Sequence, residues 1–127
     1  MTKTTSYEIS KKLEEAGFSR QPFWIWTSEQ CCAPYQTNHD GFRSYDLETI
    51  LDALPKQFQV TWFGELGKSQ AILRLTFEKD KIFYNHDSDE LRNAMYWREK
   101  EVQKTENESL ADVAGKMWLM LKEKGIV

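Results

Sequence analysis

Apolar residues recur at helical spacing in three segments of the chain, and the last of these segments is the best defined. It covers residues 109–124 and starts at Ser109, a residue type that caps helix starts well. Gly125 follows it and permits the left-handed backbone that commonly ends a helix. The apolar stripe is broad enough to require cover by a sheet or by other helices. It consists of Leu110, Val113, Ala114, Met117, Trp118 and Leu121.

The first predicted helix covers residues 6–16. Thr5 and Glu8 have the spacing of a capping box at its start. Gly17 is expected to end the helix, and Phe18 is placed to pack back onto its last turn, as in a Schellman stop. The inner face consists of Ile9, Leu13 and Ala16.

The remaining predicted helix covers residues 46–54. Asp46 is a favourable N-cap residue, and Pro55 ends the helix because the residue before a proline avoids the helical region. The i, i+3, i+4, i+7 pattern of its inner face is formed by Leu47, Ile50, Leu51 and Leu54.

Alternation of apolar and polar residues predicts an antiparallel meander in the middle of the chain. Strands are expected at residues 57–63, 70–77 and 81–85, joined by short turns. Two interpretations stay open for residues 87–107. The segment forms a helix, or it contains a fourth strand at residues 94–98, which we favour because turn-forming residues frame it.

A further strand is predicted at residues 23–27, where the sequence FWIWT is aromatic and β-prone. Trp24 and Trp26 share one face of this strand, and its other face is apolar too. The strand is therefore either central and covered on both sides, or it presents an aromatic patch to a partner. Residues 28–43 are rich in turn formers and are expected to form a long surface loop or to contain an irregular edge strand.

Together these elements predict an α+β fold, in which an antiparallel sheet of three to five strands packs with three helices as one domain over residues 1–127. No apolar run approaches the ~20 residues of a membrane-spanning helix, and residues 1–10 lack the apolar core of a secretion signal. We therefore expect a cytoplasmic protein without a membrane partner. The formal net charge of −3 argues against bulk electrostatic binding of nucleic acid. A local nucleic-acid site would require exposed Trp residues to converge with Arg20, Arg43, Arg74, Arg92 and Arg98.

The helix-bounding segments resemble those of a group of small uncharacterised proteins encoded in phages and prophages, related to the phage ABA sandwich domain. The matching runs are LEEAGF at 13–18, YDLE at 45–48 with Leu54-Pro55, NESLADVAGKMWL at 107–119 and KEKG at 122–125. The resemblance implies a compact α+β fold and an origin in a mobile element. It implies no functional residues, since the matching runs describe helix ends and helix faces.

The tripeptide Asn-His-Asp occurs twice and contains both histidines of the chain. If the two copies are adjacent in the fold, His39, Asp40, His86 and Asp87 form a nitrogen and oxygen metal site or an acid–base pair. The favoured interpretation is turn chemistry, because Asn and Asp side chains bond their own backbone at turns.

Cys31 and Cys32 are the only cysteines and are adjacent. Adjacent cysteines are unfavourable for a structural disulfide. They are also unfavourable for a zinc site with His39, because the cysteine ligands of zinc sites are usually separated by two to four residues. Neither cysteine has a neighbouring basic residue that would lower its pKa. We therefore expect reduced thiols, and no cofactor is predicted.

The sequence contains no phosphate-binding loop, nucleophile elbow or zinc-protease motif. Its surplus apolar positions are Trp24, Trp26 and Leu119, the last of which lies opposite the stripe of its helix. We therefore predict a non-enzymatic accessory protein of a phage or mobile element that binds another macromolecule, such as an unknown protein partner, or associates with itself. The alternative is a small metal-binding protein or hydrolase that uses the two Asn-His-Asp turns.

Overall fold

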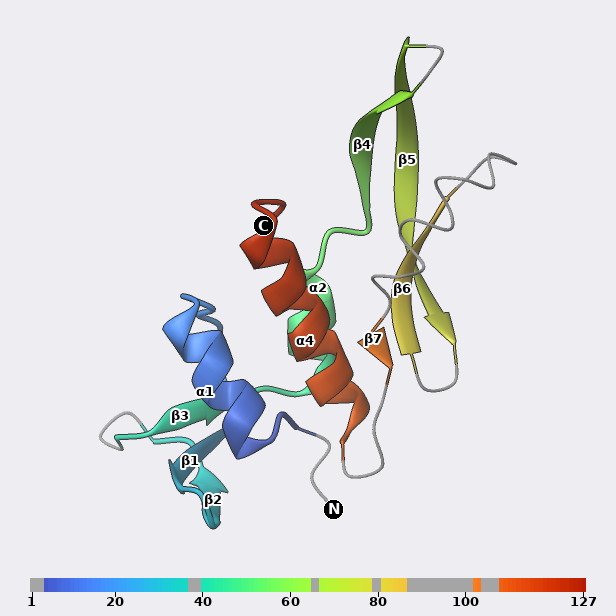
Figure 1. Cartoon of the computed structure of the whole chain (residues 1–127). Helices are drawn as coiled ribbons and strands as arrows, with labels where there is room; N and C mark the ends of the chain where they lie inside the picture. Colours follow the sequence, from blue (N-terminus) through green and yellow to red (C-terminus); the bar gives the residue numbers. More distant parts are fainter. Residues whose placement is uncertain (1–3, 37–39, 65–66, 79–80, 87–101, 104–107) are drawn as a thin grey trace. The chain divides into compact units, whose positions relative to one another are not determined.

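The computed structural model describes residues 4–36, 40–64, 67–78, 81–86, 102–103 and 108–127 (Figure 1). The chain divides into two compact units, each of which is described by itself. Unit 1 combines Met1–Leu54 with Lys104–Val127, and unit 2 is Pro55–Gln103. The prediction of one domain over residues 1–127 stays a prediction.

Unit 1 contains three helices and a three-stranded antiparallel sheet among its described residues (Figure 1). Helix α4 packs against both α1 and α2, and α1 also packs against β3 and β1. The strand order is β2-β1-β3, so β1 is central. The elements are α1 (Tyr7–Glu15), β1 (Trp24–Ser28), β2 (Cys31–Pro34), β3 (Phe42–Ser44), α2 (Leu47–Ala53) and α4 (Leu110–Glu123).

Unit 2 is a four-stranded antiparallel sheet in the order β4-β5-β6-β7. The three strands predicted as a meander are confirmed as β4 (Gln57–Gly64), β5 (Gly67–Glu78) and β6 (Lys81–His86). Strand β7 (Val102–Gln103) was not predicted. The strand predicted at residues 94–98 lies outside the described residues.

The α+β class and the antiparallel pairing are thus confirmed, but the strands belong to two sheets rather than to one. Helix α2 lies between the first three strands and the next four in the chain. Because short hairpin connections keep consecutive strands together, each side of this helix forms a sheet of its own.

The predicted loop at residues 28–43 contains strand β2 and the first two residues of β3, which confirms the alternative of an irregular edge strand. Strand β2 lies at the sheet edge, and its pairing with β1 shifts register between Trp26 and Ser28. The two strands are only four and three residues long, which is too short for alternation to reveal.

Two of the helices end as predicted. Gly17 has a φ of 89°, and the N–H of Phe18 donates to the carbonyl oxygen of Leu13 at 2.9 Å, which is the Schellman bond. Helix α4 ends in the same way at Gly125, which has a φ of 75°, with Ile126 in the place of Phe18. Local sequence therefore determines both stops.

The helix starts follow the predictions with one correction. Asp46 caps α2, and Ser109 caps α4 in a capping box with Asp112. The predicted capping box of α1 is wrong, because Ser6 rather than Thr5 is its N-cap. Thr5 is fully buried, and its hydroxyl bonds other buried groups instead.

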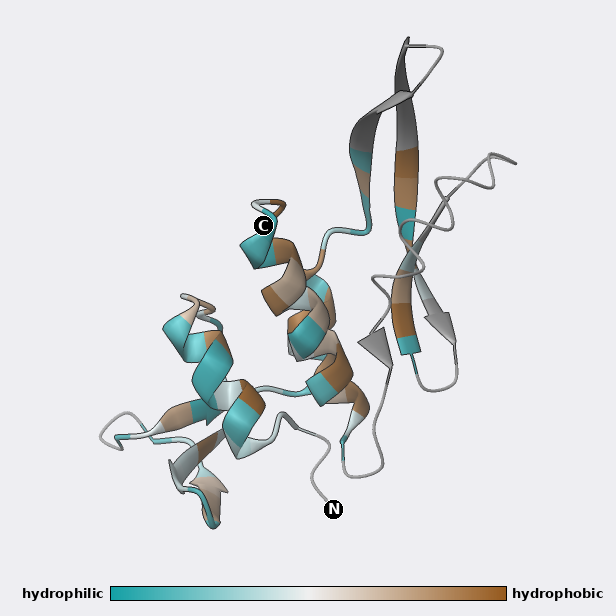
Figure 2. Cartoon of the chain, viewed as in Figure 1, coloured by the Kyte–Doolittle hydropathy of each residue, from teal (hydrophilic) through white to brown (hydrophobic). Residues whose placement is uncertain are grey.

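The core of unit 1 lies where the three helices and the sheet meet, and α4 is more hydrophobic along its length than α1 (Figure 2). This difference agrees with the position of α4, which has a helix packed on each of two sides. Leu110, predicted in the apolar stripe, is 39% exposed because it occupies the first helical position. The buried apolar residues are Ile9, Leu13, Phe18, Ile25, Tyr45, Ile50, Leu54, Ala111, Val113, Ala114, Met117, Trp118 and Leu121.

Gly115 allows α1 and α4 to approach closely. A Cβ atom at this position would lie 2.7 Å from Cγ2 of Ile9 and 3.4 Å from Cδ1 of Leu13. Glycine in a helix interior is unfavourable by about 1 kcal/mol relative to alanine, so its presence here reflects the packing of the two helices.

In unit 2, Tyr84 ties β6 to the start of the sheet. Its hydroxyl donates to the carbonyl oxygen of Pro55 at 2.7 Å, and its ring packs edge to face against Phe58 at 4.7 Å. Burial raises the pKa of the Tyr84 hydroxyl above its usual range. Leu73, Ile82, Phe83 and Tyr84 are buried. No helix of the described residues is both long enough and apolar enough to cross a membrane.

Candidate binding surface

Strand β1 buries Ile25 and exposes the two aromatic residues that precede it in the chain. Ile25 is only 2% exposed, whereas Trp24 is 41% exposed and Phe23, just before the strand, is 69% exposed. Both sequence interpretations of this strand are therefore partly right. The strand is central, as the first required, and it presents exposed aromatic side chains, as the second required.

Trp24 and Trp26 lie on one face of β1 together with Phe42 of β3, which pairs directly with Trp26. Tyr7, the first residue of α1, packs edge to face against two of these rings, with centroids 6.2 Å from Trp26 and 5.5 Å from Phe42. We call these four residues the aromatic face. They come from two strands and a helix, so the surface exists only when unit 1 is folded.

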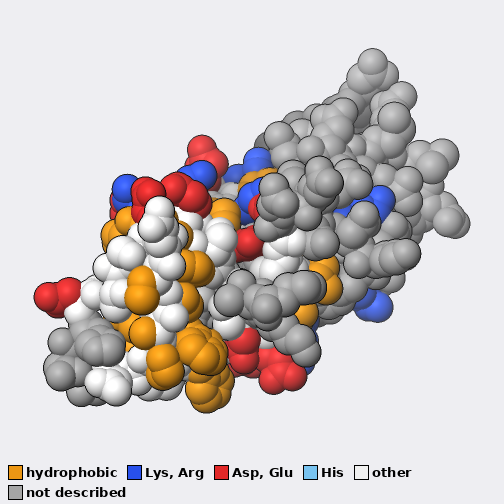
Figure 3. All heavy atoms as spheres, turned by 90° about the horizontal axis from the view of Figure 1, so that it is seen from below, with side chains coloured by type: hydrophobic (Ala, Val, Ile, Leu, Met, Phe, Trp, Pro, Cys, Tyr) orange, Lys and Arg blue, Asp and Glu red, His pale blue; other side chains and the backbone are white. Residues whose placement is uncertain are grey.

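Hydrophobic side chains gather at one end of unit 1, and charged side chains lie around that area. Figure 3 views the molecule from the end of unit 1 at which the sheet lies, and hydrophobic side chains gather there with uncharged atoms between them. Acidic and basic side chains appear at the margins of that area. An apolar centre with a polar rim is the usual anatomy of a protein interface.

On the opposite face of the sheet, Arg43 lies over the ring of Tyr35, with its guanidinium carbon 5.9 Å from the centroid. The backbone N–H of Tyr35 donates to the carbonyl oxygen of Phe23 at 2.9 Å and so extends the pairing of β2 with β1. Arg43 also donates to the hydroxyl of Ser19 at 3.3 Å. This arginine is thus engaged within unit 1, close to the exposed Phe23.

A fully buried polar centre supports the aromatic face. The carbonyl oxygen of Thr5 accepts hydrogen bonds from the indole N–H of Trp26 at 3.0 Å, the hydroxyl of Ser44 at 2.7 Å and the hydroxyl of Ser10 at 3.3 Å. The hydroxyl oxygen of Thr5 accepts from the backbone N–H of Tyr45 at 3.0 Å. Sequence reasoning missed this centre, because Thr5 and Ser44 are distant in the chain and no motif links them.

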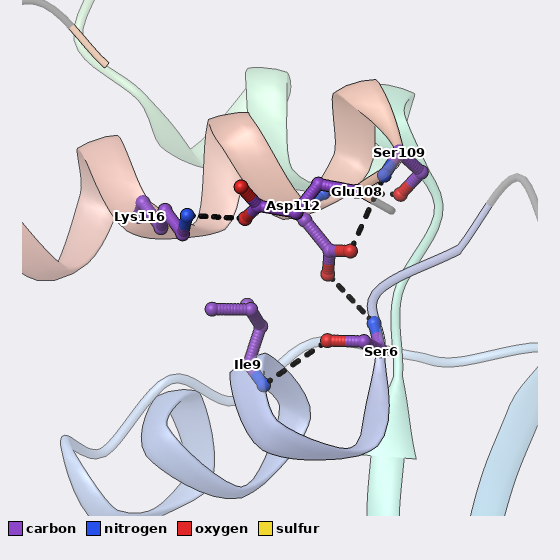
Figure 4. Close-up of polar contacts among 6 residues, drawn as sticks. All are labelled: Ser6, Ile9, Glu108, Ser109, Asp112 and Lys116. Carbon is purple, nitrogen blue, oxygen red and sulfur yellow. Dashed lines mark hydrogen bonds and ion pairs between the residues drawn. The ribbon is translucent and has the colours of Figure 1, made fainter. Parts of the chain in front are cut away.

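A second polar contact joins the start of α4 to the start of α1. Figure 4 shows the Asp112 carboxylate between them, accepting from the backbone N–H of Ser6 at 2.7 Å and of Ser109 at 3.3 Å. Asp112 is only 2% exposed. The hydroxyl of Ser109 donates to the carbonyl oxygen of Thr4 at 3.2 Å. Further along the helix, Lys116 pairs with Glu108.

The two cysteines do not form an activated pair. Cys31 is exposed and Cys32 half-buried, and both are free. They are neighbours in β2, so their side chains point to opposite faces of the sheet. Burial, with a smaller contribution from Cys31, raises the pKa of the Cys32 thiol. A raised pKa disfavours the thiolate that nucleophilic or metal chemistry requires.

The structure does not bring the two Asn-His-Asp copies together within one described unit. Asp40 is exposed in unit 1, and the backbone of His86 ends β6 in unit 2 opposite Leu73. His39 and Asp87 lie outside the described residues. No cluster of three His, Cys, Asp or Glu residues suited to a metal ion occurs in the described part of the chain. The metal hypothesis stays a prediction.

Leu119, the predicted contact residue of α4, is half-buried, whereas its neighbours Met117 and Trp118 are buried. The ammonium group of Lys122 lies 6.0 Å from the centroid of the Trp118 ring. The exposure of Leu119 is thus smaller than that of Trp24, and the sheet of unit 1 offers the larger exposed aromatic area.

No protein-family model, no curated protein and no solved structure matches the chain. The resemblance of its helix-bounding segments to the phage group therefore stays a prediction. The function has to be argued from the surface that unit 1 presents.

Proposed function

We propose that the protein is a non-enzymatic binding protein that contacts another protein, or a second copy of itself, through the exposed rings at the start of β1, which are Trp24 on the aromatic face and Phe23 on the opposite side of the strand. The observation that carries this proposal is the exposure of Phe23 and Trp24 in consecutive positions, at 69% and 41%. An accessory role in a phage or another mobile element is part of the proposal, and it rests on the sequence resemblance alone.

The energy available at this surface is sufficient for an anchor. Aromatic side chains bury 150–250 Å² each, so covering the exposed parts of Phe23 and Trp24 would remove roughly 200 Å² of apolar surface from water. At about 25 cal/mol per Å², that burial is worth about 5 kcal/mol before the costs of association. Aromatic residues of this kind supply most of the binding energy at many interfaces.

The character of the surface supports contact rather than catalysis. The indole N–H of Trp26 donates to the carbonyl oxygen of Thr5, and the rings of Tyr7 and Phe42 are held by edge-to-face contacts. Three of the four rings of the aromatic face are therefore held in position beside the exposed Trp24, which lowers the entropic cost of binding at this face.

The experiment compares the wild type with three variants. The double variant Phe23→Ser/Trp24→Ser removes the anchor, and Ile72→Ser is the matched control, because Ile72 is 43% exposed in unit 2. Sedimentation velocity over a wide concentration range measures self-association, and cross-linking in cells followed by mass spectrometry identifies other partners. Leu119→Ser tests the predicted contact on α4 separately.

We expect an associated species, or a cross-linked partner, that the wild type and Ile72→Ser share and the double variant loses. Circular dichroism must show that all variants are folded. The proposal is wrong if the wild type stays monomeric and the double variant cross-links to the same proteins as the control.

A further inference from the structure

Residues Thr4–Ser6, which we call the N-terminal latch, bond to three separate parts of unit 1. Thr4 forms a β-bridge with Asp46, and the N–H of Thr5 donates to the carbonyl oxygen of Tyr45 at 2.9 Å. The carbonyl oxygen of Thr5 accepts from Trp26, and the N–H of Ser6 donates to Asp112. Three residues thus connect the end of β3, the aromatic face and α4.

Displacing the latch would leave several buried polar groups without hydrogen-bond partners. Thr5 is 0% exposed, and the hydroxyls of Ser10 and Ser44 and the indole N–H of Trp26 all converge on its carbonyl oxygen. Buried polar groups that lose their partners are costly, so these bonds form or break as a set. The Asp112 carboxylate lies at the N-terminal ends of α1 and α4, where the helix dipoles favour a negative charge.

We propose that the N-terminal latch assembles the aromatic face and that Asp112 is the residue that holds it in place. Tyr7 directly follows the latch, so release of the latch withdraws the ring that packs on Trp26 and Phe42. Release also leaves the Trp26 indole without its acceptor and opens the backbone of Tyr45 at the end of β3. The inference rests on the proposed function, because it names the regulation of the same surface.

The Thr4 side chain allows a variant that should stabilise the docked latch. The Thr4 hydroxyl is buried and has no hydrogen-bond partner among the described residues. Valine has nearly the same shape without the hydroxyl, so Thr4→Val removes an unpaired buried polar group and favours the docked latch. Asp112→Ala has the opposite effect, because it removes the acceptor of the Ser6 N–H.

The reporter is hydrogen exchange of the Trp26 indole N–H, followed by NMR and assigned from the signal that Trp26→Phe removes. We expect exchange to be faster in Asp112→Ala by roughly tenfold or more, the factor that corresponds to about 1.4 kcal/mol. The matched control is Asp46→Ala, which removes the N-cap of α2 without removing a side-chain bond to the latch. Both variants lower the melting temperature, but only Asp112→Ala accelerates the exchange.

Equal exchange rates in Asp112→Ala and Asp46→Ala, or an unchanged rate in Asp112→Ala, overturn the proposal. If Asp112→Ala does not fold, Thr4→Val decides, since slower exchange supports the latch and an unchanged or faster rate refutes it. The outcome is separate from the binding experiment above. A failed latch leaves the effect of Phe23→Ser/Trp24→Ser intact, and a failed binding experiment leaves the indole exchange intact.

Discussion

Replacing Gly115 by alanine tests whether the close packing of α1 and α4 is as tight as the structure indicates. The added methyl group raises helix propensity, which favours the variant by about 1 kcal/mol. Against this gain, the new Cβ would lie 2.7 Å from Cγ2 of Ile9. That atom belongs to a β-branched side chain that has one favoured rotamer on a helix, so it cannot rotate away.

Forcing an extra methyl group into a packed core costs typically 1–3 kcal/mol and occasionally more. A contact of 2.7 Å places Gly115→Ala toward the upper end of this range. We therefore expect a net destabilisation of about 1–2 kcal/mol, which lowers the melting temperature by roughly 3–8 °C. Urea unfolding followed by far-UV circular dichroism measures the free energy of unfolding.

The matched control is a double-mutant cycle with Ile9→Ala, which removes the Cγ2 atom that the new methyl group meets. Ile9→Ala alone is expected to cost about 2–4 kcal/mol, because it leaves a cavity. In the double variant the methyl group at position 115 occupies part of that cavity. The sum of the destabilisations of Gly115→Ala and Ile9→Ala should therefore exceed the destabilisation of the double variant by at least 1 kcal/mol. Two results would refute the reasoning. One is a Gly115→Ala protein whose free energy of unfolding rises by about the 1 kcal/mol expected from helix propensity alone. The other is a double variant whose destabilisation equals the sum of the two single effects.

Three further predictions concern the buried tyrosines and the cysteines. Tyr84→Phe removes the donor to the carbonyl oxygen of Pro55, so urea unfolding should show a loss of about 1–2 kcal/mol, and unchanged stability would contradict the importance of this bond. Burial raises the pKa of Tyr45 and Tyr84, so the unfolded chain loses these protons first. The free energy of unfolding should therefore be fully present below pH ~10 and fall as the pH rises beyond it, and a flat alkaline profile would argue against this. Cys31 is exposed and Cys32 half-buried with a raised pKa, so a thiol reagent should modify Cys31 first, and mass spectrometry showing equal rates would disprove the difference.

The helix ends were predictable because their determinants are local. Gly17 and Gly125 each follow an apolar stripe, and Asp46 and Ser109 precede one, so the chain specifies these boundaries within a few residues. The prediction that Thr5 caps the first helix failed because a hydroxyl at this position can form either of two kinds of hydrogen bond. Capping a helix and bonding buried groups require the same residue type, and only the fold decides between them.

The polar contacts behind the candidate surface were not predictable. Ser6 and Asp112 are separated by 106 positions, and no sequence motif links one to the other. The exposure of Trp24 was left open for a related reason, since both faces of FWIWT are apolar and the alternation that would orient the strand is missing. Strands β2 and β3 are too short to show a period.

The division of unit 1 into two stretches of sequence has a consequence for its synthesis. Helices α1 and α2 leave the ribosome long before α4, with the ~50 residues of unit 2 between them. At about 5–20 residues per second, this interval lasts roughly 2–10 s. During that time α4 is not yet available to cover the apolar faces of α1 and α2. The hairpins of unit 2 have time to form in the same interval, because their contacts are local. Unit 1 is therefore completed only when α4 emerges, after the whole of unit 2 has been made.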